Sequence, residues 1–288
     1  VSGQGKYGIL IDVITTKCDR RYNMSLSFCS FSSGSSGNCY MVFTETTAVL
    51  VDAGISGKRI MEGIDYIQAD TDSICALLIT HEHIDHVRSV RVLNKKLPGL
   101  KTYANEKTWE QIDDLVPEEK RRVFSADEEF EIGDMTVRPF RTSHDAVESV
   151  GFSFYSGGRQ VSIVTDTGYI SDEMFASIRD ADILVIEANH DVNVLQMCSY
   201  PYQTKRRIAG DFGHLSNEAA ADCICRITME YPKDRQVLLA HLSNENNSPS
   251  LAHLTIKNIL EENRLYIDRD LRLSVISRDE ISPVYIAL

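Results

Sequence analysis

The sequence predicts an α/β (α+β) protein built as a four-layer αββα sandwich, in which two sheets pack face to face and helices cover their outer faces. Short apolar strand segments alternate with helical segments from residue 24 onward, and the strands come in two sets, each followed by helices. Strands with two apolar faces need a second sheet on one side and helices on the other. The chain has no evident internal repeat, low-complexity tract or long linker, so we expect residues 24–288 to form one domain.

The first set of elements begins with an alternating run of apolar and polar residues from Met24 to Phe31. The pair Pro98-Gly99 then marks the end of a helix, because neither residue continues one. In chain order, we expect strands at 40–43 and 48–51, a helix at 57–67, a buried strand at 74–79, a helix at 87–97, a strand at 101–104 and a helix at 106–115.

The second set opens with consecutive strands whose turns fall at 132–134 and 156–158, where glycine is frequent. In chain order, we expect strands at 128–140, 151–155 and 160–165, a helix at 172–178, a buried strand at 182–187, helices at 202–209 and 216–230, a strand at 236–240, a helix at 250–263 and two closing strands.

The segment 1–23 shows no clear periodicity and differs in character from the rest of the chain. Met24 is a natural start for the domain. We therefore interpret residues 1–23 as an N-terminal extension, which is either non-native or disordered, or else a genuine addition. Its apolar stretch at 7–14 is short and contains an acid, so we do not interpret it as a signal peptide.

Composition limits the cellular setting and the partners. The seven cysteines are scattered and odd in number, which argues against a disulfide scaffold and predicts a cytoplasmic protein. No apolar run has the length of a membrane span, so we expect no membrane partner. The net charge of −12, taken alone, disfavours nucleic acid as a partner.

The densest group of ionisable residues is the run Thr80–His86, which comes after the predicted buried strand 74–79. It places His81, His83 and His86 beside Glu82 and Asp85. Imidazole and carboxylate are natural ligands of zinc, manganese and iron. A packed core rarely accommodates so many ionisable groups without a metal ion to pair with them. The run therefore predicts a metal site at the carboxyl end of a strand.

Four further ionisable residues share one pattern, in which an apolar strand is followed by the residue and then by a turn. They are Asp52, His144, Asp166 and His241. One such residue by itself is most often a helix cap or a solvated group. Four of them in a chain that also carries the run Thr80–His86 indicate that they complete the same metal site.

These residues together make the chain resemble the metallo-β-lactamase superfamily, whose motif HxHxDH is present as His81, His83, Asp85 and His86. The resemblance implies two divalent metal ions. One would be bound by His81, His83 and His144, and the other by Asp85, His86 and His241. Asp166 would bridge the two ions, and Asp52 would orient a ligand imidazole. Zinc, manganese and iron all suit such ligands.

Within that superfamily the chain resembles the YycJ/WalJ-type metallo-hydrolases. The matching stretches are 32–38, 80–86, 143–146, 161–169, 187–191 and 213–217, and Ser89 departs from the pattern at a position where glycine is expected. The resemblance implies a bacterial, cytosolic enzyme with 5′→3′ exonuclease activity, for which DNA ends are the substrate.

The expected reaction is hydrolysis of a phosphodiester by a hydroxide that bridges two metal ions. The expected catalytic residues are Asp85, His190 and His214. The two histidines would bind the phosphate or protonate the leaving oxygen, and the alternative for each is a structural role.

Candidate residues for binding phosphate or DNA fall in four places. Arg88, Arg91 and Lys95 are spaced along one face of the predicted helix 87–97, and Lys205, Arg206 and Arg207 lie in a stretch without acids. Ser36 and Asn38 belong to the loop 32–38, which is rich in glycine and serine, and Asn189 comes after the strand 182–187. The alternatives are a solvated helix surface for each basic patch and a simple turn for the loop.

Three alternatives to a DNA exonuclease are considered. The fold is equally compatible with the first, whereas the other two are disfavoured. A small-molecule metallo-hydrolase acting on a thioester, lactone or cyclic phosphodiester would use the same fold, which does not decide between substrates. A β-lactamase is disfavoured because the chain shows no credible export signal. A non-enzymatic regulatory or scaffold protein is disfavoured because it has no need of seven ligands. The sequence does not indicate an oligomeric state.

Overall fold

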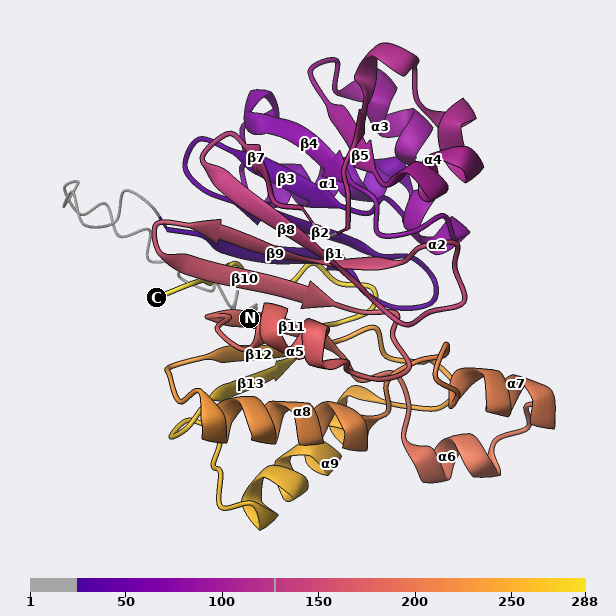
Figure 1. The fold of residues 1–288 in the computed structure, drawn as a ribbon, viewed down its shortest axis with the longest axis vertical. Helices are drawn as coiled ribbons and strands as arrows, with labels where there is room; N and C mark the ends of the chain where they lie inside the picture. The colour runs from indigo at the N-terminus through magenta and orange to yellow at the C-terminus, as the bar shows by residue number, and fades with distance from the viewer. Residues whose placement is uncertain (1–24, 127) are drawn as a thin grey trace, which may run out of the picture.

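The computed structural model describes residues 25–126 and 128–288, and Figure 1 shows it as two stacked sheets with helices on both outer faces. The predicted four-layer αββα sandwich is confirmed. The N-terminal extension expected at residues 1–23 lies outside the described residues.

The first sheet has seven strands in the order β14-β1-β2-β3-β4-β5-β6. Its early strands are antiparallel, whereas β3 to β6 run parallel to one another. The C-terminal strand β14 pairs with β1 at one edge. The strands are β1 (Ser27–Ser32), β2 (Cys39–Phe43), β3 (Ala48–Val51), β4 (Ile74–Leu78), β5 (Lys101–Ala104), β6 (Arg121–Val123) and β14 (Tyr285–Ile286).

The second sheet also has seven strands, in the order β13-β12-β11-β10-β9-β8-β7. Strands β10 to β13 are parallel, and β9 is antiparallel to both β8 and β10, so β8 points the same way as β10. The strands are β7 (Phe130–Ile132), β8 (Met135–Arg141), β9 (Val150–Ser156), β10 (Arg159–Val164), β11 (Ile183–Glu187), β12 (Gln236–Ala240) and β13 (Arg272–Val275).

Helices cover the outer face of each sheet. The first sheet packs against α1 (Gly57–Tyr66), α2 (Ile84–Val87), α3 (Val90–Lys96) and α4 (Glu106–Ile112), and the second against α5 (Asp172–Ile178), α8 (Asn217–Glu230) and α9 (Pro249–Glu262). Short 3-10 turns span Thr71–Ser73, Asp113–Leu115 and Glu118–Lys120. A third apolar cluster lies between the sheets and includes Phe28, Val42, Phe152 and Phe154, all fully buried. The other two apolar clusters lie between each sheet and its helices. Burial of the three clusters fixes the sheets relative to one another.

Two helices, α6 (Val192–Met197) and α7 (Tyr202–Ile208), come after β11 and stand apart from α8 and α9 (Figure 1). The helix at α7 was expected, whereas α6 was not. The Asp191 side chain caps α6 by accepting hydrogen bonds from the backbone N–H groups of Asn193 and Val194. Among the described residues, no helix has both the length and the apolar character needed to cross a bilayer.

The helix expected over residues 87–97 is present as α3, but it begins at Val90, three residues later than expected. Helix α2 ends at Val87 and α3 begins at Val90, with Ser89 between them at φ −109°. The Ser89 hydroxyl donates a hydrogen bond to the carbonyl oxygen of Ile55 at 2.6 Å. This bond ties the segment to the turn after β3.

Candidate metal centre

Strand direction brings the predicted ligands together. Asp52 and the run Thr80–His86 come after the parallel strands β3 and β4 of the first sheet. His144, Asp166 and His241 come after β8, β10 and β12, which point the same way in the second sheet. The two edges are joined where the Val150 backbone N–H donates to the Thr80 carbonyl oxygen at 3.2 Å. The carboxyl ends of these strands, two from the first sheet and three from the second, therefore meet at one site.

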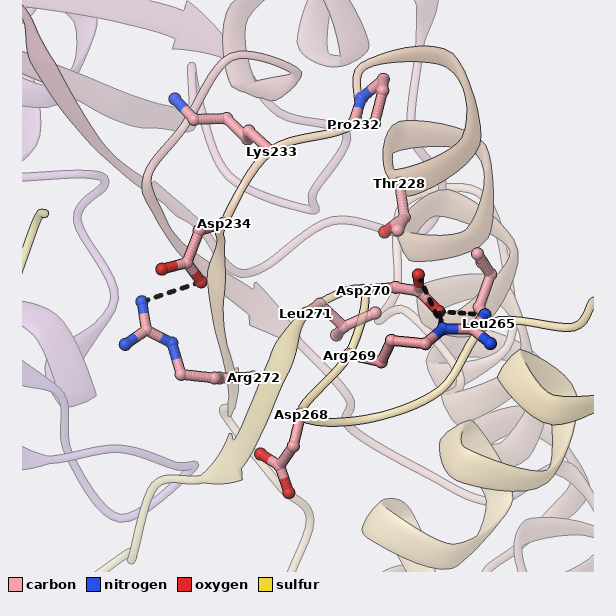
Figure 2. Close-up of a pocket in the computed structure, with 10 residues that line it drawn as sticks. All are labelled: Thr228, Pro232, Lys233, Asp234, Leu265, Asp268, Arg269, Asp270, Leu271 and Arg272. Carbon is pink, nitrogen blue, oxygen red and sulfur yellow. Dashed lines mark hydrogen bonds and ion pairs between the residues drawn. The ribbon is translucent and has the colours of Figure 1, made fainter.

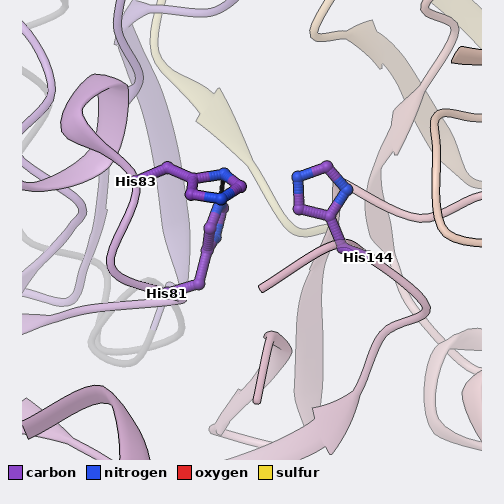
Figure 3. A group of neighbouring side chains, drawn as sticks. All are labelled: His81, His83 and His144. Carbon is purple, nitrogen blue, oxygen red and sulfur yellow. Dashed lines mark hydrogen bonds between the residues drawn. The ribbon is translucent and has the colours of Figure 1, made fainter. Parts of the chain in front are cut away.

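The first group of ligand atoms comes from His81, His83 and His144, whose candidate ligand nitrogens all lie within 4.8 Å of one another. Figure 3 shows His81 and His83 on the loop after β4, facing His144 on the opposite loop. The Nε2 atom of His81 lies 3.1 Å from Nδ1 of His83.

The second group comes from Asp85, His86 and His241, again with ligand atoms within 4.8 Å of one another. Asp166 lies between the two groups. Its Oδ2 atom is 3.6 Å from His86 Nε2, and its Oδ1 atom is 3.5 Å from His241 Nε2 and 3.8 Å from His144 Nε2. One carboxylate thus reaches both groups, as a bridging ligand would.

The hydrogen bonds of the ring Nδ1 atoms leave Nε2 lone pairs facing the centre. His86 Nδ1 donates to Asp52 Oδ2 at 2.7 Å, His241 Nδ1 to Glu187 Oε1 at 2.8 Å, and His144 Nδ1 to the carbonyl oxygen of Gly213 at 3.1 Å. His81 Nδ1 lies 2.9 Å from the Thr80 hydroxyl. These bonds place a proton on Nδ1 and leave Nε2 as the atom that would bind a metal ion.

These donors fit divalent metal ions. Asp166 Oδ2 and His241 Nε2 are buried and have no hydrogen-bond partner among the described residues. Ligand atoms around a tetrahedral zinc ion, at about 2.0 Å from it, are about 3.3 Å apart. The spacings of 3.1 to 3.8 Å are close to this value. A buried, unpaired carboxylate oxygen facing imidazole lone pairs is unfavourable unless a cation satisfies both.

The backbone is strained at three of these positions. Asp52, Asp166 and His241 have φ angles of 61°, 57° and 55°. Residues other than glycine seldom adopt this left-handed conformation, which costs about 1–3 kcal/mol. In each case the chain turns sharply as the strand ends, so that the side chain remains at the edge of the sheet.

Asp52 and Gly54 support the ligands His86 and Asp85, which come from the first sheet. Asp52 accepts hydrogen bonds from the backbone N–H and hydroxyl of Thr80 as well as from His86. Gly54 packs so closely on the backbone of Asp85 that a Cβ there would lie 1.5 Å from the Asp85 carbonyl oxygen. Only glycine permits this approach.

Glu187 supports the ligand His241, which comes from the second sheet, and its role was not foreseen. It is fully buried at the end of β11. Its Oε1 accepts from His241 and His214, and its Oε2 accepts from the backbone N–H groups of Thr167 and Leu215. The same pattern of an apolar strand ending in an ionisable residue could have identified it.

The charges inside the centre suit a cation. Burial alone would raise the pKa of Asp166, but the surrounding imidazoles, above all His241, hold it well below its usual range. Burial likewise opposes ionisation of Glu187, yet the charge of His214 lowers the pKa of Glu187 to about 2. Burial, with a contribution from His86, keeps the pKa of His81 well below its usual range. Ionised carboxylates therefore face the imidazoles, among which burial keeps His81 neutral.

A cavity of about 290 Å³ opens onto the ligands, and His83, Asp85, His144, Asp166 and His241 line it. Its remaining wall includes His214, Asn189, Ser35 and Arg207. The larger cavity in Figure 2, of about 700 Å³, lies elsewhere, between the end of α8 and the start of β13. Its charged residues are largely paired with one another, as in Arg269–Asp270 and Arg272–Asp234, so it lacks the features of the metal site.

The structure brings only some of the predicted DNA-binding residues to this cavity. Arg207 lines it and pairs with Asp145 at 2.6 Å, and Asn189 donates from Nδ2 to the His241 carbonyl oxygen. Arg88 Nη1 donates to the Ser36 carbonyl oxygen at 3.3 Å, on the loop whose residue Ser35 lines the cavity.

The other predicted residues lie elsewhere. Arg91 pairs with Asp114 and, with Lys95, lines a separate cavity. Asn38 is fully buried, with Nδ2 3.2 Å from His86 Nε2, so it supports the loop rather than lining the cavity. Lys205, Arg206 and His190 line a neighbouring cavity.

His214 is the one expected catalytic histidine that lines the metal cavity. Its ring lies 5.0 Å from that of His144 and 5.3 Å from that of His241, measured between centroids. Burial opposes its protonation, but the Glu187 carboxylate raises the pKa of His214 to about 9.

Comparison with known proteins agrees with this geometry. Residues 47–242 match the model of the beta-lactamase superfamily domain. The chain is 39% identical to exodeoxyribonuclease YycJ of Bacillus anthracis over 83% of this chain and 90% of that protein. It is 38% identical to exodeoxyribonuclease WalJ of Streptococcus pneumoniae over 88% of this chain and 95% of that protein.

The fold is also found among solved structures. The metallo-beta-lactamase fold protein YhfI from Bacillus subtilis superposes with a TM-score of 0.68 at 17% identity, covering 91% of this chain and 99% of that one. The chain therefore belongs to the beta-lactamase superfamily and, within it, to the YycJ/WalJ type of metal-dependent hydrolases.

Proposed function

We propose that this protein is a dinuclear metal-dependent phosphodiesterase that degrades DNA from its 5′ ends. The observation that carries the proposal is the convergence of two ligand groups on the shared carboxylate of Asp166, whose Oδ2 is buried without a hydrogen-bond partner among the described residues. The names of the two exodeoxyribonuclease relatives support DNA as the substrate.

The chemistry that two divalent ions supply in such a site is acidification of water at neutral pH and neutralisation of charge on the phosphoryl group. Zinc, manganese and iron all suit the ligands, since imidazole and carboxylate bind each of them and no thiolate is present in either group.

The chain's own residues position the substrate and move the proton. His214 lines the cavity beside both ligand groups, and the Glu187 carboxylate 2.8 Å from its Nδ1 stabilises the protonated ring. In that form Nε2–H can donate to the leaving oxygen of the scissile phosphodiester. Arg207 lines the cavity and Arg88 bonds to the loop that carries Ser35 of its wall, so both would contact flanking phosphates.

The deciding experiment compares duplex DNA carrying a 5′-phosphate or a 5′-hydroxyl, labelled at one end or the other, with and without added manganese. We expect early release of the 5′ label as mononucleotide. Asp85→Ala should abolish degradation, whereas the matched variant Asp114→Ala, at an exposed ion pair away from the cavity, should retain it. If metal-loaded protein leaves every DNA substrate intact but hydrolyses a thioester or lactone, the small-molecule hydrolase is the correct function.

We also place this activity in the cytoplasm. Six of the seven cysteines lie among the described residues, and all six are free thiols, which supports a reducing compartment. Fractionation of the native host, followed by immunodetection, would test this placement.

A further inference from the structure

A second cavity, of about 390 Å³, lies between α6 and α7, directly beside the metal cavity. Helix α7 separates the two. Thr204, Arg207 and Ile208 of this helix line the metal cavity, whereas Lys205 and Arg206 line the second one. Tyr200 belongs to both walls, so the two cavities adjoin at this residue. A volume of this order is in the range of small-molecule sites.

His190, a buried residue that lines the second cavity, has one polar atom without a partner among the described residues. His190 is 2% exposed, and its Nδ1 atom has no hydrogen-bond partner among the described residues. Burial lowers the pKa of His190 to about 4, so the ring is neutral at pH 7 and offers one N–H donor and one acceptor. An unsatisfied polar atom at such depth destabilises the fold by about 1–3 kcal/mol, which a ligand that pairs with it would offset.

The rest of the wall is apolar and aromatic, with cations at its rim. Val192, Leu195 and Ala209 line it together with Tyr200 and Tyr202. Tyr202 is 74% exposed, and the Arg206 guanidinium lies 6.0 Å from the centre of its ring. Arg206 forms no ion pair with any residue the structure describes. The Lys205 ammonium donates to the Gln196 carbonyl oxygen at 2.6 Å, which bridges α7 to α6.

We propose that this cavity is a nucleobase subsite, which holds a base of the nucleotide next to the scissile phosphodiester. The inference rests on the proposed function and adds to it a contact with the base. An enzyme that recognises only the phosphates of DNA does not need this contact. A base is flat, stacks on tyrosine, and presents donors and acceptors at its edge, which His190 can meet. Its attached phosphates are anionic and match Lys205 and Arg206 at the rim.

Other occupants match these features less well. A purely apolar ligand would leave the Nδ1 atom of His190 unpaired, and a free phosphate would not use the aromatic wall. The larger cavity of Figure 2 is no competitor, because its arginines already have carboxylate partners. A base lying in the second cavity would require an unpaired end, so the subsite favours single-stranded or frayed termini over blunt duplex ends.

The test measures KM and kcat of the metal-loaded protein on single-stranded oligonucleotides. One substrate carries normal bases, and the others carry an abasic residue at the first or second position from the 5′ end. We expect the abasic residue at one of these positions to raise KM about tenfold, since stacking of one base contributes on that order, with a smaller effect on kcat. Tyr202→Ala should raise KM for the normal substrate to the abasic value and leave the abasic substrate unchanged.

Two further variants complete the design. His190→Phe keeps a ring in the wall but removes the polar atoms, and we expect it to raise KM severalfold for the normal substrate alone. Tyr66→Ala is the matched control, because Tyr66 is 64% exposed on α1 and lines neither cavity. If Tyr202→Ala and His190→Phe distinguish normal from abasic DNA as well as the unmodified protein does, the subsite is overturned while the nuclease stands.

If the protein degrades no DNA, calorimetry separates the two proposals. Thymidine 5′-monophosphate should then still bind at least tenfold more tightly than deoxyribose 5-phosphate, and Tyr202→Ala should remove this difference. That result would support the nucleobase subsite without the nuclease. Equal binding of the two compounds would overturn the subsite.

Discussion

Glu187 Oε1 lies 2.8 Å from Nδ1 of His241, and the same oxygen lies 2.8 Å from Nδ1 of His214. One buried carboxylate thereby orients a ligand imidazole and the imidazole placed to donate a proton. In the proposed reaction, metal binding and proton transfer would therefore be coupled through a single oxygen atom of a fully buried acid.

Replacing Glu187 with Gln is expected to lower metal content and activity together. The amide cannot accept both imidazole N–H bonds as a carboxylate does, and loss of such supporting contacts typically lowers affinity or activity by about 10- to 100-fold. Elemental analysis of the purified variant and its kcat on DNA would check this. Glu62→Gln, at an exposed ion pair with Lys58, is the control and should behave as the unmodified protein does. Full metal occupancy in Glu187→Gln would contradict the assigned role.

Metal removal is expected to lower the melting temperature of the unmodified protein. Ions that bind only the folded state stabilise it in proportion to the logarithm of their concentration over Kd. Scanning calorimetry before and after chelation, and after adding back zinc, manganese or iron, would measure the shift. Asp166→Asn should show a much smaller shift, whereas Asp172→Asn, on a side chain that is 97% exposed, should keep it. A chelator without effect on either melting temperature or activity would refute the metal centre.

Gly54→Ala is expected to destabilise the fold by about 3 kcal/mol or more, because the added Cβ would lie 1.5 Å from the Asp85 carbonyl oxygen. The Asp85 backbone would have to move, so metal binding should weaken as well. Chemical denaturation would give the change in the free energy of unfolding. Gly99→Ala is the matched control, since nothing lies within 4 Å of a Cβ at that position. Similar stabilities for the two variants would show that the turn after β3 can move to accommodate the Cβ at little cost in free energy.

The two basic patches, at residues 205–207 and 88–95, should contribute differently to the affinity for DNA. Arg207→Ala removes a cation that lines the metal cavity, and we expect weaker binding to a DNA end with a salt slope that is smaller by about one. Arg91→Ala should leave DNA binding unchanged, because Arg91 pairs with Asp114 at a different cavity. Fluorescence anisotropy over a range of salt concentrations would distinguish them. Equal losses would place the DNA across α3 as well.

The pH dependence of stability should carry a contribution from His190. Its pKa is lowered to about 4 in the folded protein by burial, with Glu187, His214 and Asp191 as the nearest charges, and is about 6.5 when unfolded. The unfolded chain therefore binds the proton first. The contribution is fully present above pH 6.5 and is lost as the pH falls towards 4, by at most about 3 kcal/mol. Denaturation curves should show a weaker loss of stability over this range in His190→Phe. An identical loss would mean that His190 is charged in the folded state.

Most residues of the metal centre could be predicted from the sequence by one local pattern. Asp52, His144, Asp166 and His241 were each found as ionisable residues after an apolar strand, and parallel strands bring such residues to one edge. Glu187 follows the same pattern but was assigned to the strand itself, because its role depends on partners that lie 27 and 54 residues further along the chain.

The features that escaped prediction depend on tertiary packing. The helical spacing of Arg88, Arg91 and Lys95 assumes one unbroken helix, yet Ser89 bonds to Ile55 and separates α2 from α3. Helix α6 is short, with only Leu195 buried, so its residues show little periodicity. The cavity beside it exists only because α6 and α7 lie next to one another, which no spacing along the chain reveals.

The left-handed backbone at Asp52, Asp166 and His241 sets stability and function against each other at three positions. Glycine adopts this conformation freely, so glycine there would relieve strain while removing a ligand or its support. A library of variants selected only for resistance to heat in the presence of a chelator should therefore accumulate glycine at these positions and lose activity. Engineering of a more thermostable, active enzyme would have to keep all three residues unchanged and place stabilising substitutions in the outer helices.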